Sequence, residues 1–142
     1  MRVSFLFVVL CIIACSPKQN SVIPYNRAEL KKRTFDYFWQ TADKTNFQIP
    51  DRYPTQTFSS IAATGFGLSA YITGIENKYI SRAEGADRVL KTLKVLWDLP
   101  QGEDETGVSG HKGFFYHFLT LDKATRFKQV ELSSIDTGLL MA

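Results

Sequence analysis

The sequence predicts an all-α protein in which a buried helix is followed by a half-exposed one. Residues 59–76 follow helical spacing, but they are rich in alanine and glycine and carry one charged residue, so this helix should be buried on most sides. Residues 81–97 carry a single apolar stripe with charged side chains beside it, which is typical of a helix with one exposed face. This alternation indicates the inner and outer helices of a layered α-structure.

The N-terminal 25 residues are expected to direct export rather than to join this fold. Met1–Arg2 is basic, Val3–Ile13 is apolar but too short to span a bilayer, and small residues precede Cys15. Residues 1–14 are therefore predicted as a signal peptide. Ile-Ile-Ala-Cys resembles a bacterial lipobox, which predicts lipidation of Cys15; a plain signal peptide or an N-terminal anchor is the alternative.

This pattern predicts a bacterial cell-envelope protein. Residues 15–25 would form a lipidated tether, holding the protein to a membrane through its lipid anchor only, on the periplasm-facing side or at the cell surface. With Cys11 removed in the leader and Cys15 lipidated, no pair of thiols is left for a disulfide. No basic block is interleaved with aromatic residues, so nucleic acid is not an expected partner.

Capping patterns mark where the helices should begin. Asn26 with Glu29, and Ser81 with Glu84, have the spacing of capping boxes. The first helix should bury one apolar face and end near residues 43–46, and Leu99–Pro100 should end the third. In the second helix we expect Gly65 and Gly67 to allow close approach of a neighbouring helix.

The segment between the first two helices carries a candidate binding pair. Pro50 and Pro54 exclude a helix and predict an extended loop. Asp51 and Arg52 lie between them as a possible substrate-binding pair, and a local ion pair is an equally good interpretation.

The segment from Gly107 to Asp136 should hold the functional site. Long loops that carry aromatic and acidic residues between helices are more often functional than connecting. We expect residues 114–121 and 126–132 to pair as a hairpin across residues 122–125. Aromatic faces beside carboxylates suit a sugar, whose C–H face stacks on rings and whose glycosidic oxygen needs an acid.

Glu131 and Asp136 are the candidate catalytic residues of this segment. Glycoside hydrolysis needs one carboxylic acid and a second carboxylate, and these two lie at the start of a predicted fourth helix. Asp136 also fits a helix cap, because Ser133-x-x-Asp136 is itself a capping box. The further candidates for substrate binding in this segment are His111, Lys112, Phe115 and Tyr116.

Several of these residues have other interpretations. The spacing of His111 and His117 does not suit a metal site, so no metal is predicted, and His117 is more simply a packed residue among aromatics. Tyr116 fits a stacking platform and the core equally well. Trp97 is more simply a core residue because it lies on an apolar stripe.

These residues together resemble the start of the bacterial glucoamylase-like glycoside hydrolases, which include the endo-β-1,2-glucanases of family GH144. The strings that carry the resemblance are RTFDYFW (33–39), PDRYP (50–54), FSSIAATGFGLSAY (58–71), LWDLPQG (96–102), GVSGHKGFFYHFL (107–119) and ELSSIDTGLLMA (131–142).

The resemblance implies an (α/α)6 toroid with a sugar pocket at one end, of which this chain would supply the first three to four helices. Residues 26–142 would then be the truncated N-terminal part of such a domain. The implied function is hydrolysis of a glucan, most simply a β-1,2-glucan, without an organic cofactor, in a chain too short to be active alone. The alternatives are a non-catalytic glycan-binding surface lipoprotein and the inactive remnant of a split gene.

Overall fold

The computed structural model describes residues 26–142, so the predicted signal peptide, the lipidation at Cys15 and the tether lie outside the described residues. The described part contains four helices and five short strands. The helices are α2 (Arg27–Thr41), α3 (Ile61–Glu76), α4 (Arg82–Asp98) and α5 (Ser134–Met141). The strands are β1 (Ser59–Ser60), β2 (Gly110–His111), β3 (Phe114–Tyr116), β4 (Phe118–Leu119) and β5 (Leu132–Ser133).

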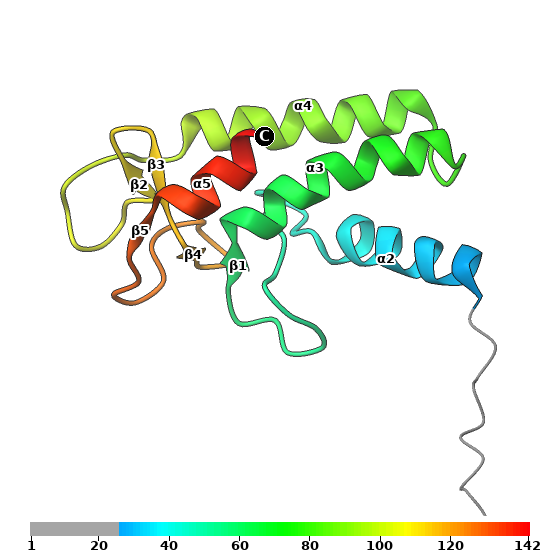
Figure 1. Ribbon diagram of the computed structural model, residues 1–142. Coiled ribbons are helices and arrows are strands. Elements are labelled where there is room, and N and C mark those ends of the chain that lie inside the picture. Colours follow the sequence, from blue (N-terminus) through cyan, green and yellow to red (C-terminus); the bar gives the residue numbers. More distant parts are fainter. Residues whose placement is uncertain (1–25) are drawn as a thin grey trace, which may run out of the picture.

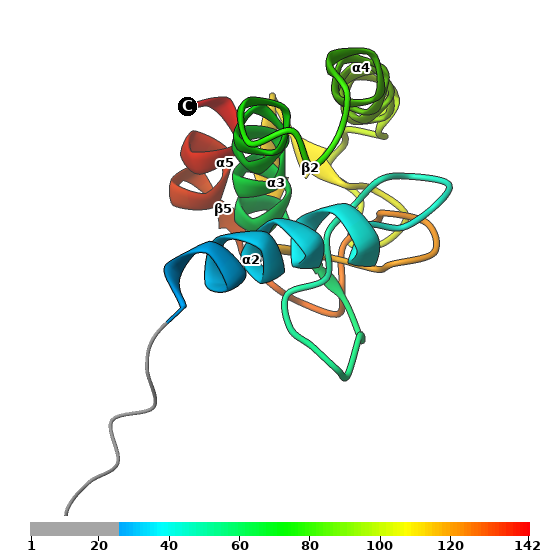
Figure 2. The ribbon, with the colours of Figure 1, turned by 90° about the vertical axis from the view of Figure 1, so that its right-hand side faces the viewer.

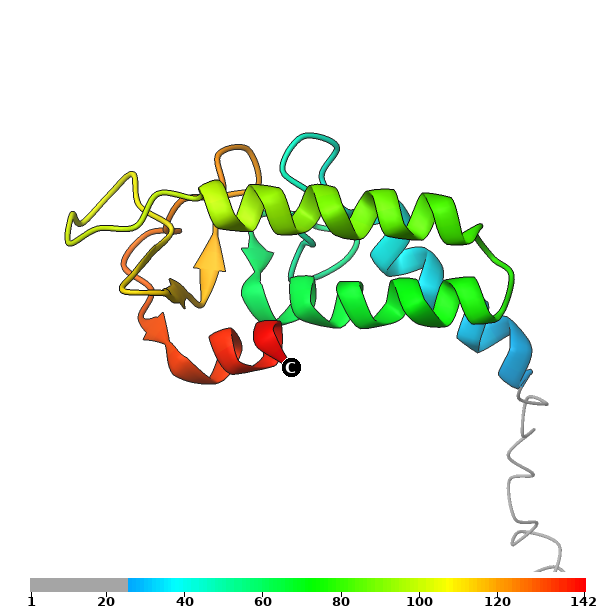
Figure 3. The ribbon, with the colours of Figure 1, turned by 90° about the horizontal axis from the view of Figure 1, so that it is seen from above.

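Helix α3 lies at the centre of this arrangement and packs against α2, α4 and α5. Figure 1 shows α3 and α4 running side by side along the molecule, with α2 below them. In the end-on view of Figure 2, α5 lies beside α3 and α4 lies apart on the other side. Seen from above in Figure 3, the strands gather at the end where α3 and α5 begin. Side chains carried by the strands therefore lie near the starts of two helices.

The helix starts predicted at Asn26 and Ser81 are confirmed, whereas α3 begins at Ile61 and not at Ser59, because Ser59–Ser60 form β1. The Asn26 side chain accepts hydrogen bonds from the backbone amides of Ala28 and Glu29, at 3.1 and 3.2 Å. At the start of α4, Ser81 and Glu84 form both bonds of a capping box. These bonds satisfy backbone donors that have no partner within the helix, which is why local sequence fixes the positions where these helices begin.

The glycines of α3 allow the close contacts that the sequence predicts. A Cβ atom on Gly65 would lie 2.5 Å from the carbonyl oxygen of Leu139 in α5, so this pair of helices approaches more closely than alanine permits. Gly74 lies against the Phe35 ring of α2, while Gly67 faces the side chain of Ile49 in a loop rather than a helix. The small residues of α3 therefore serve contacts on several sides, but the predicted burial is only partly correct, because Phe66 and Ile72 are 52% and 63% exposed.

The strands form two small antiparallel sheets that the sequence did not predict. β1 pairs with β4, and β3 pairs with both β2 and β5. The predicted hairpin is only partly correct: Leu119 bridges Arg126, and Thr120 N donates to Thr125 O at 2.7 Å, which closes the expected turn. A hydrogen bond from Phe127 N to Phe118 O, at 3.0 Å, extends the hairpin by one residue on each side. Beyond it, β3 pairs with β2 and β5 instead.

The C-terminal half of α4 departs from the sequence-based interpretation. Trp97, expected in the core, is 90% exposed. It lines an apolar groove of about 440 Å³ together with Leu93 of the same helix, Phe115, and Leu140 and Met141 of α5.

No helix among residues 26–142 has both the length and the apolar character needed to cross a bilayer.

Candidate active site

His117 lies between the two carboxylates that the sequence selects as catalytic candidates. Its Nδ1 atom is 2.8 Å from Oε1 of Glu131, and its Nε2 atom is 3.6 Å from Oδ1 of Asp136. A neutral imidazole donates from one ring nitrogen only, whereas a protonated one can donate from both. The structure thus places Glu131 and Asp136 on opposite sides of a single ring.

Backbone hydrogen bonds fix the position of His117. Its amide donates to the carbonyl oxygen of Glu131 at 3.0 Å, next to the pairing of Tyr116 with Leu132 between β3 and β5. Its own carbonyl oxygen accepts from the amide of Ile61, the first residue of α3, at 3.2 Å. His117 therefore joins the start of α3 to the strand that leads into α5.

An aromatic row continues from the His117 ring. The ring stacks on Phe118 with a centroid separation of 3.8 Å, and Phe118 lies 4.5 Å from Phe58. Phe58 in turn contacts Phe127, with ring centroids 4.7 Å apart, and the guanidinium of Arg52 lies 5.2 Å above its ring. The row connects the predicted Asp51–Arg52 pair to the carboxylate cluster.

The Glu131 carboxyl is held in its ionised form. A hydrogen bond with its own backbone amide, followed by the hydrogen bond and charge of His117, lowers the pKa of Glu131 below its usual value. A side chain that protonates a glycosidic oxygen needs a raised pKa, because it must still hold its proton near neutral pH. The direction of this shift suits a base or an acceptor for a sugar hydroxyl, and it argues against Glu131 as the proton donor.

Asp136 belongs to the cap of α5 and also lies beside His117. Its backbone amide donates to Ser133 Oγ at 3.1 Å, and the Ser133 hydroxyl also hydrogen-bonds to the Asp136 carboxylate. The other carboxylate oxygen faces His117. With 14% of its side chain exposed, Asp136 is both a residue of the helix cap and a partly buried member of the cluster.

The other predicted site residues in the loops lie beside the cluster or away from it. Asp51 and Arg52 form a local ion pair at 3.0 Å, although the aromatic row leads from Arg52 toward His117. His111 lies with its Nδ1 atom 3.2 Å from the carbonyl oxygen of Gly102. Lys112 is exposed in the turn between β2 and β3, with a φ of 50°.

The two predicted aromatic platforms are buried. Phe115 is 5% exposed and belongs to the hydrophobic core, where its amide donates a hydrogen bond to the Thr137 hydroxyl at 2.9 Å. Tyr116 is 8% exposed, with the guanidinium of Arg126 4.3 Å above its ring. Neither ring is brought together with the carboxylate cluster, and their role in substrate binding stays a prediction.

The sequence analysis missed three residues of this site: His117, Phe58 and Phe118. His117 does stack on Phe118, as expected of a packed residue, but both of its ring nitrogens face carboxylates. The signal in the sequence is that His117, Glu131 and Asp136 lie within one 20-residue segment. Which of them meet is decided by the register of β3 against β5, which two-residue strands do not reveal in a sequence.

Comparisons with known proteins identify structures of similar fold. No protein-family profile matches the chain. The described residues have the fold of glucoamylase-like proteins: one from Bacteroides fragilis superposes with a TM-score of 0.64 at 24% identity, over 80% of this chain and 28% of that one. This identity is low enough that the similarity establishes the fold alone.

Two of the solved structures with this fold are β-1,2-glucanases. An endo-β-1,2-glucanase from Chitinophaga pinensis, solved with sophorotriose and glucose, has a TM-score of 0.64 at 22% identity over 80% of this chain and 28% of that one. A β-1,2-glucanase from Parabacteroides distasonis has a TM-score of 0.65 at 23% identity over 79% of this chain and 16% of that one.

One curated sequence relative agrees with these structures. It is the exo β-1,2-glucooligosaccharide sophorohydrolase (non-reducing end) of Parabacteroides distasonis, which is 31% identical over 68 residues. The match covers 47% of this chain and 9% of that protein. The chain therefore spans a small part of the curated relative and less than a third of each solved one. The predicted resemblance to glucoamylase-like proteins is confirmed at the level of the fold.

Proposed function

We propose that this chain contributes the His117–Glu131–Asp136 cluster to the sugar site of a glycoside hydrolase that acts on a β-1,2-linked glucan. The observation that carries the proposal is the placement of two carboxylates on one imidazole, at the end of the molecule where α3 and α5 begin. The glucan-acting relatives support the choice of substrate.

Each residue of the cluster has a chemical task in this proposal. Glu131, held ionised, accepts a hydrogen bond from a sugar hydroxyl or activates a water molecule. Asp136 is the second carboxylate and is fixed by the helix cap, so its geometry depends little on substrate. Phe58 and Phe118, with Arg52 above, would offer an apolar face beside the acids, as sugar rings require.

The wider architecture is part of the same proposal. The central, glycine-rich α3 and the half-exposed α4 have the burial expected of an inner and an outer helix of an (α/α)6 toroid. In such a toroid the loops at one end of the helices form the pocket, and the cluster lies in loops of this kind. Location at the bacterial cell envelope, through lipidation of Cys15, is supported by the sequence pattern of residues 1–15.

Hydrolysis by the longest protein product that contains this chain tests the proposal, because the chain alone spans 28% or less of the solved glucan-acting relatives. We expect release of reducing sugar from β-1,2-glucan, and a loss of about a hundredfold or more in the Asp136→Asn and Glu131→Gln variants. Asp122→Asn and Glu103→Gln are matched controls on exposed loops and should retain activity. Retained activity in both cluster variants would refute the assignment of the site.

Glycan binding without hydrolysis is the second candidate function. It is favoured by the lowered pKa of Glu131, which suits an acceptor for sugar hydroxyls and does not need a proton donor. Titration calorimetry with β-1,2-gluco-oligosaccharides distinguishes the two functions. Binding without release of sugar supports the second candidate, and the absence of both refutes a glucan site in this chain.

A further inference from the structure

The first quarter of the chain is much more basic than the rest. Residues 15–33, which follow the predicted signal peptide, contain five Lys and Arg residues and a single acid, Glu29, which gives a net charge of +4. Eleven basic and thirteen acidic residues remain for residues 34–142, a net charge of −2. A charge asymmetry of this kind indicates an interaction of the basic part with a polyanion or an anionic surface.

Two cations at the start of α2 have no anionic partner among residues 26–142. Arg27 and Lys31 are one helical turn apart on the same face, while Glu29 lies two residues from each and so faces away from them. Within residues 26–142 neither takes part in an ion pair, although the neighbouring Lys32 pairs with Asp36. Residues 1–25 contain no Asp or Glu.

This arrangement is unfavourable for the helix itself. Like charges four residues apart repel each other, and cations near a helix N-terminus oppose the helix dipole. Both terms become favourable when an anion lies between the two side chains. The placement is therefore explained by an anion that comes from outside the chain.

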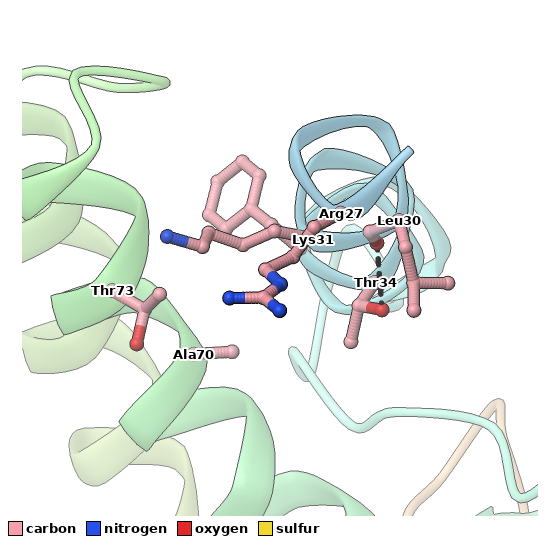
Figure 4. Close-up of a pocket in the computed structure, with 7 residues that line it drawn as sticks. Arg27, Leu30, Lys31, Thr34, Ala70 and Thr73 are labelled. Atoms are coloured by element: carbon pink, nitrogen blue, oxygen red, sulfur yellow. Dashed lines mark hydrogen bonds between the residues drawn. The ribbon is translucent and has the colours of Figure 1, made fainter. Parts of the chain in front are cut away.

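The two side chains stand at the edge of a cavity between α2 and α3. Figure 4 shows Arg27 and Lys31 extending from α2 toward α3, above Ala70 and Thr73. The cavity has a volume of about 320 Å³, and Leu30, Thr34 and Phe35 complete its lining. The Lys31 ammonium donates to Asn77 Oδ1 at 3.1 Å, which holds it across the gap. The site thus offers two cations over a largely apolar floor.

We propose that this face of α2 binds the headgroup of an anionic phospholipid at a membrane surface. Arg27 and Lys31 would contact the phosphate, and the apolar floor would receive the glycerol and upper acyl region. A soluble anion would use the cations but leave the apolar floor without a function. The proposal is independent of the glucan site, which lies at the opposite end of the molecule from the start of α2 (Figure 1).

The predicted lipidation of Cys15 would bring this surface close to the membrane. A basic patch beside a lipid anchor adds electrostatic attraction to anionic lipids, which is a second membrane contact. The eleven residues from Cys15 to Tyr25 reach at most about 40 Å when extended, which keeps α2 near the bilayer. Contact through the start of α2 would turn the end with the His117 cluster away from the membrane.

Vesicle binding tests the proposal with the full chain carrying Cys15→Ser, so that no lipid is attached. The probe is a vesicle with about one third phosphatidylglycerol in phosphatidylcholine, at low salt. The test variant adds Arg27→Gln and Lys31→Gln. The control variant adds Lys94→Gln and Lys123→Gln, which change the net charge equally on α4 and in the loop between β4 and β5. Both contain the same residues 1–14, so any contribution of that apolar segment cancels.

We expect the test variant to bind about thirtyfold more weakly, because each cation near an anionic surface changes the partition coefficient roughly fivefold. The control variant should bind within about twofold of the parent, and vesicles of phosphatidylcholine alone should not distinguish the variants. Equal weakening in both variants would refute a specific surface, and so would unchanged binding in the test variant. Inorganic phosphate that binds Arg27 and Lys31 equally well in the absence of vesicles would show a soluble anion as the ligand, and would refute the lipid.

Discussion

The Nδ1 atom of His117 lies 2.8 Å from Oε1 of Glu131, although fourteen residues separate them in the chain. The amide of His117 also donates to the carbonyl oxygen of Glu131, so backbone and side chain connect the same two residues. This double connection makes the ionisation of Glu131 dependent on the His117 ring.

Replacing His117 with Phe should raise the pKa of Glu131. The Phe ring can keep the stacking on Phe118 but cannot bond to the carboxylate, while the bond of Glu131 with its own amide remains. The pKa should therefore move only part of the way back toward its ordinary value. Carbon-13 NMR titration of the Glu131 carboxyl measures this shift. His111→Phe is the control, and an unchanged Glu131 pKa in His117→Phe would show that the contact has no electrostatic effect.

The stability of the folded state should fall at acid pH, and part of this loss should come from Glu131. The pKa of Glu131 is lower in the folded than in the unfolded chain, so its stabilising contribution is complete above the unfolded-state pKa. That contribution disappears as the pH falls through the folded-state pKa. Urea unfolding followed by circular dichroism at several pH values should show the parent and Glu131→Gln converging at low pH. A constant difference between them across the acid range would contradict the expectation.

Ser81→Ala should destabilise the protein by about 1 kcal/mol, because it removes the capping box at the start of α4. The same change should raise the pKa of Glu84, which is lowered first by the Ser81 side chain and then by the Ser81 backbone. Thermal unfolding and NMR titration measure the two effects. Ser69→Ala, at an exposed position within α3, is the control and should not lower stability.

Two glycine-to-alanine changes should have opposite effects. Gly65→Ala should destabilise the protein by about 1–3 kcal/mol, since the new Cβ would lie 2.5 Å from Leu139 O and 2.7 Å from Leu140 Cα. Gly138→Ala, in α5 with nothing near its Cβ position, should stabilise by about 0.5–1 kcal/mol. Urea unfolding of both variants measures the difference. A Gly65→Ala variant as stable as Gly138→Ala would show that α3 and α5 are not in close contact.

The helices could be predicted from the sequence because their signals are local. The Asn26 and Ser81 caps, and the loss of polar residues around α3, each lie within one or two helical turns. The strands could not be predicted, because two-residue segments such as β1 and β4 show no periodicity and pair across 57 or more intervening residues. Their pairing depends on how α3 and the Gly107–Asp136 segment meet.

Some residues of the candidate site could likewise be predicted from the sequence, and others could not. Glu131 and Asp136 could be selected from their chemistry and position before α5, and the structure brings them to one ring. His117 could not be selected, because its partners are set by the register of β3 with β5. Trp97 was wrongly expected in the core, because an apolar stripe identifies a face but not what covers it.

The two tryptophans of the chain lie in contrasting surroundings. Trp39 lies under the guanidinium of Arg88, which is 4.2 Å from its ring, and against Tyr71, whereas Trp97 is 90% exposed. Fluorescence from Trp97 should therefore be red-shifted and readily quenched by acrylamide, while Trp39 should be shielded until the contact between α2 and α4 is lost. The protein thus carries two built-in optical reporters, one for the groove beside α4 and one for the integrity of the fold.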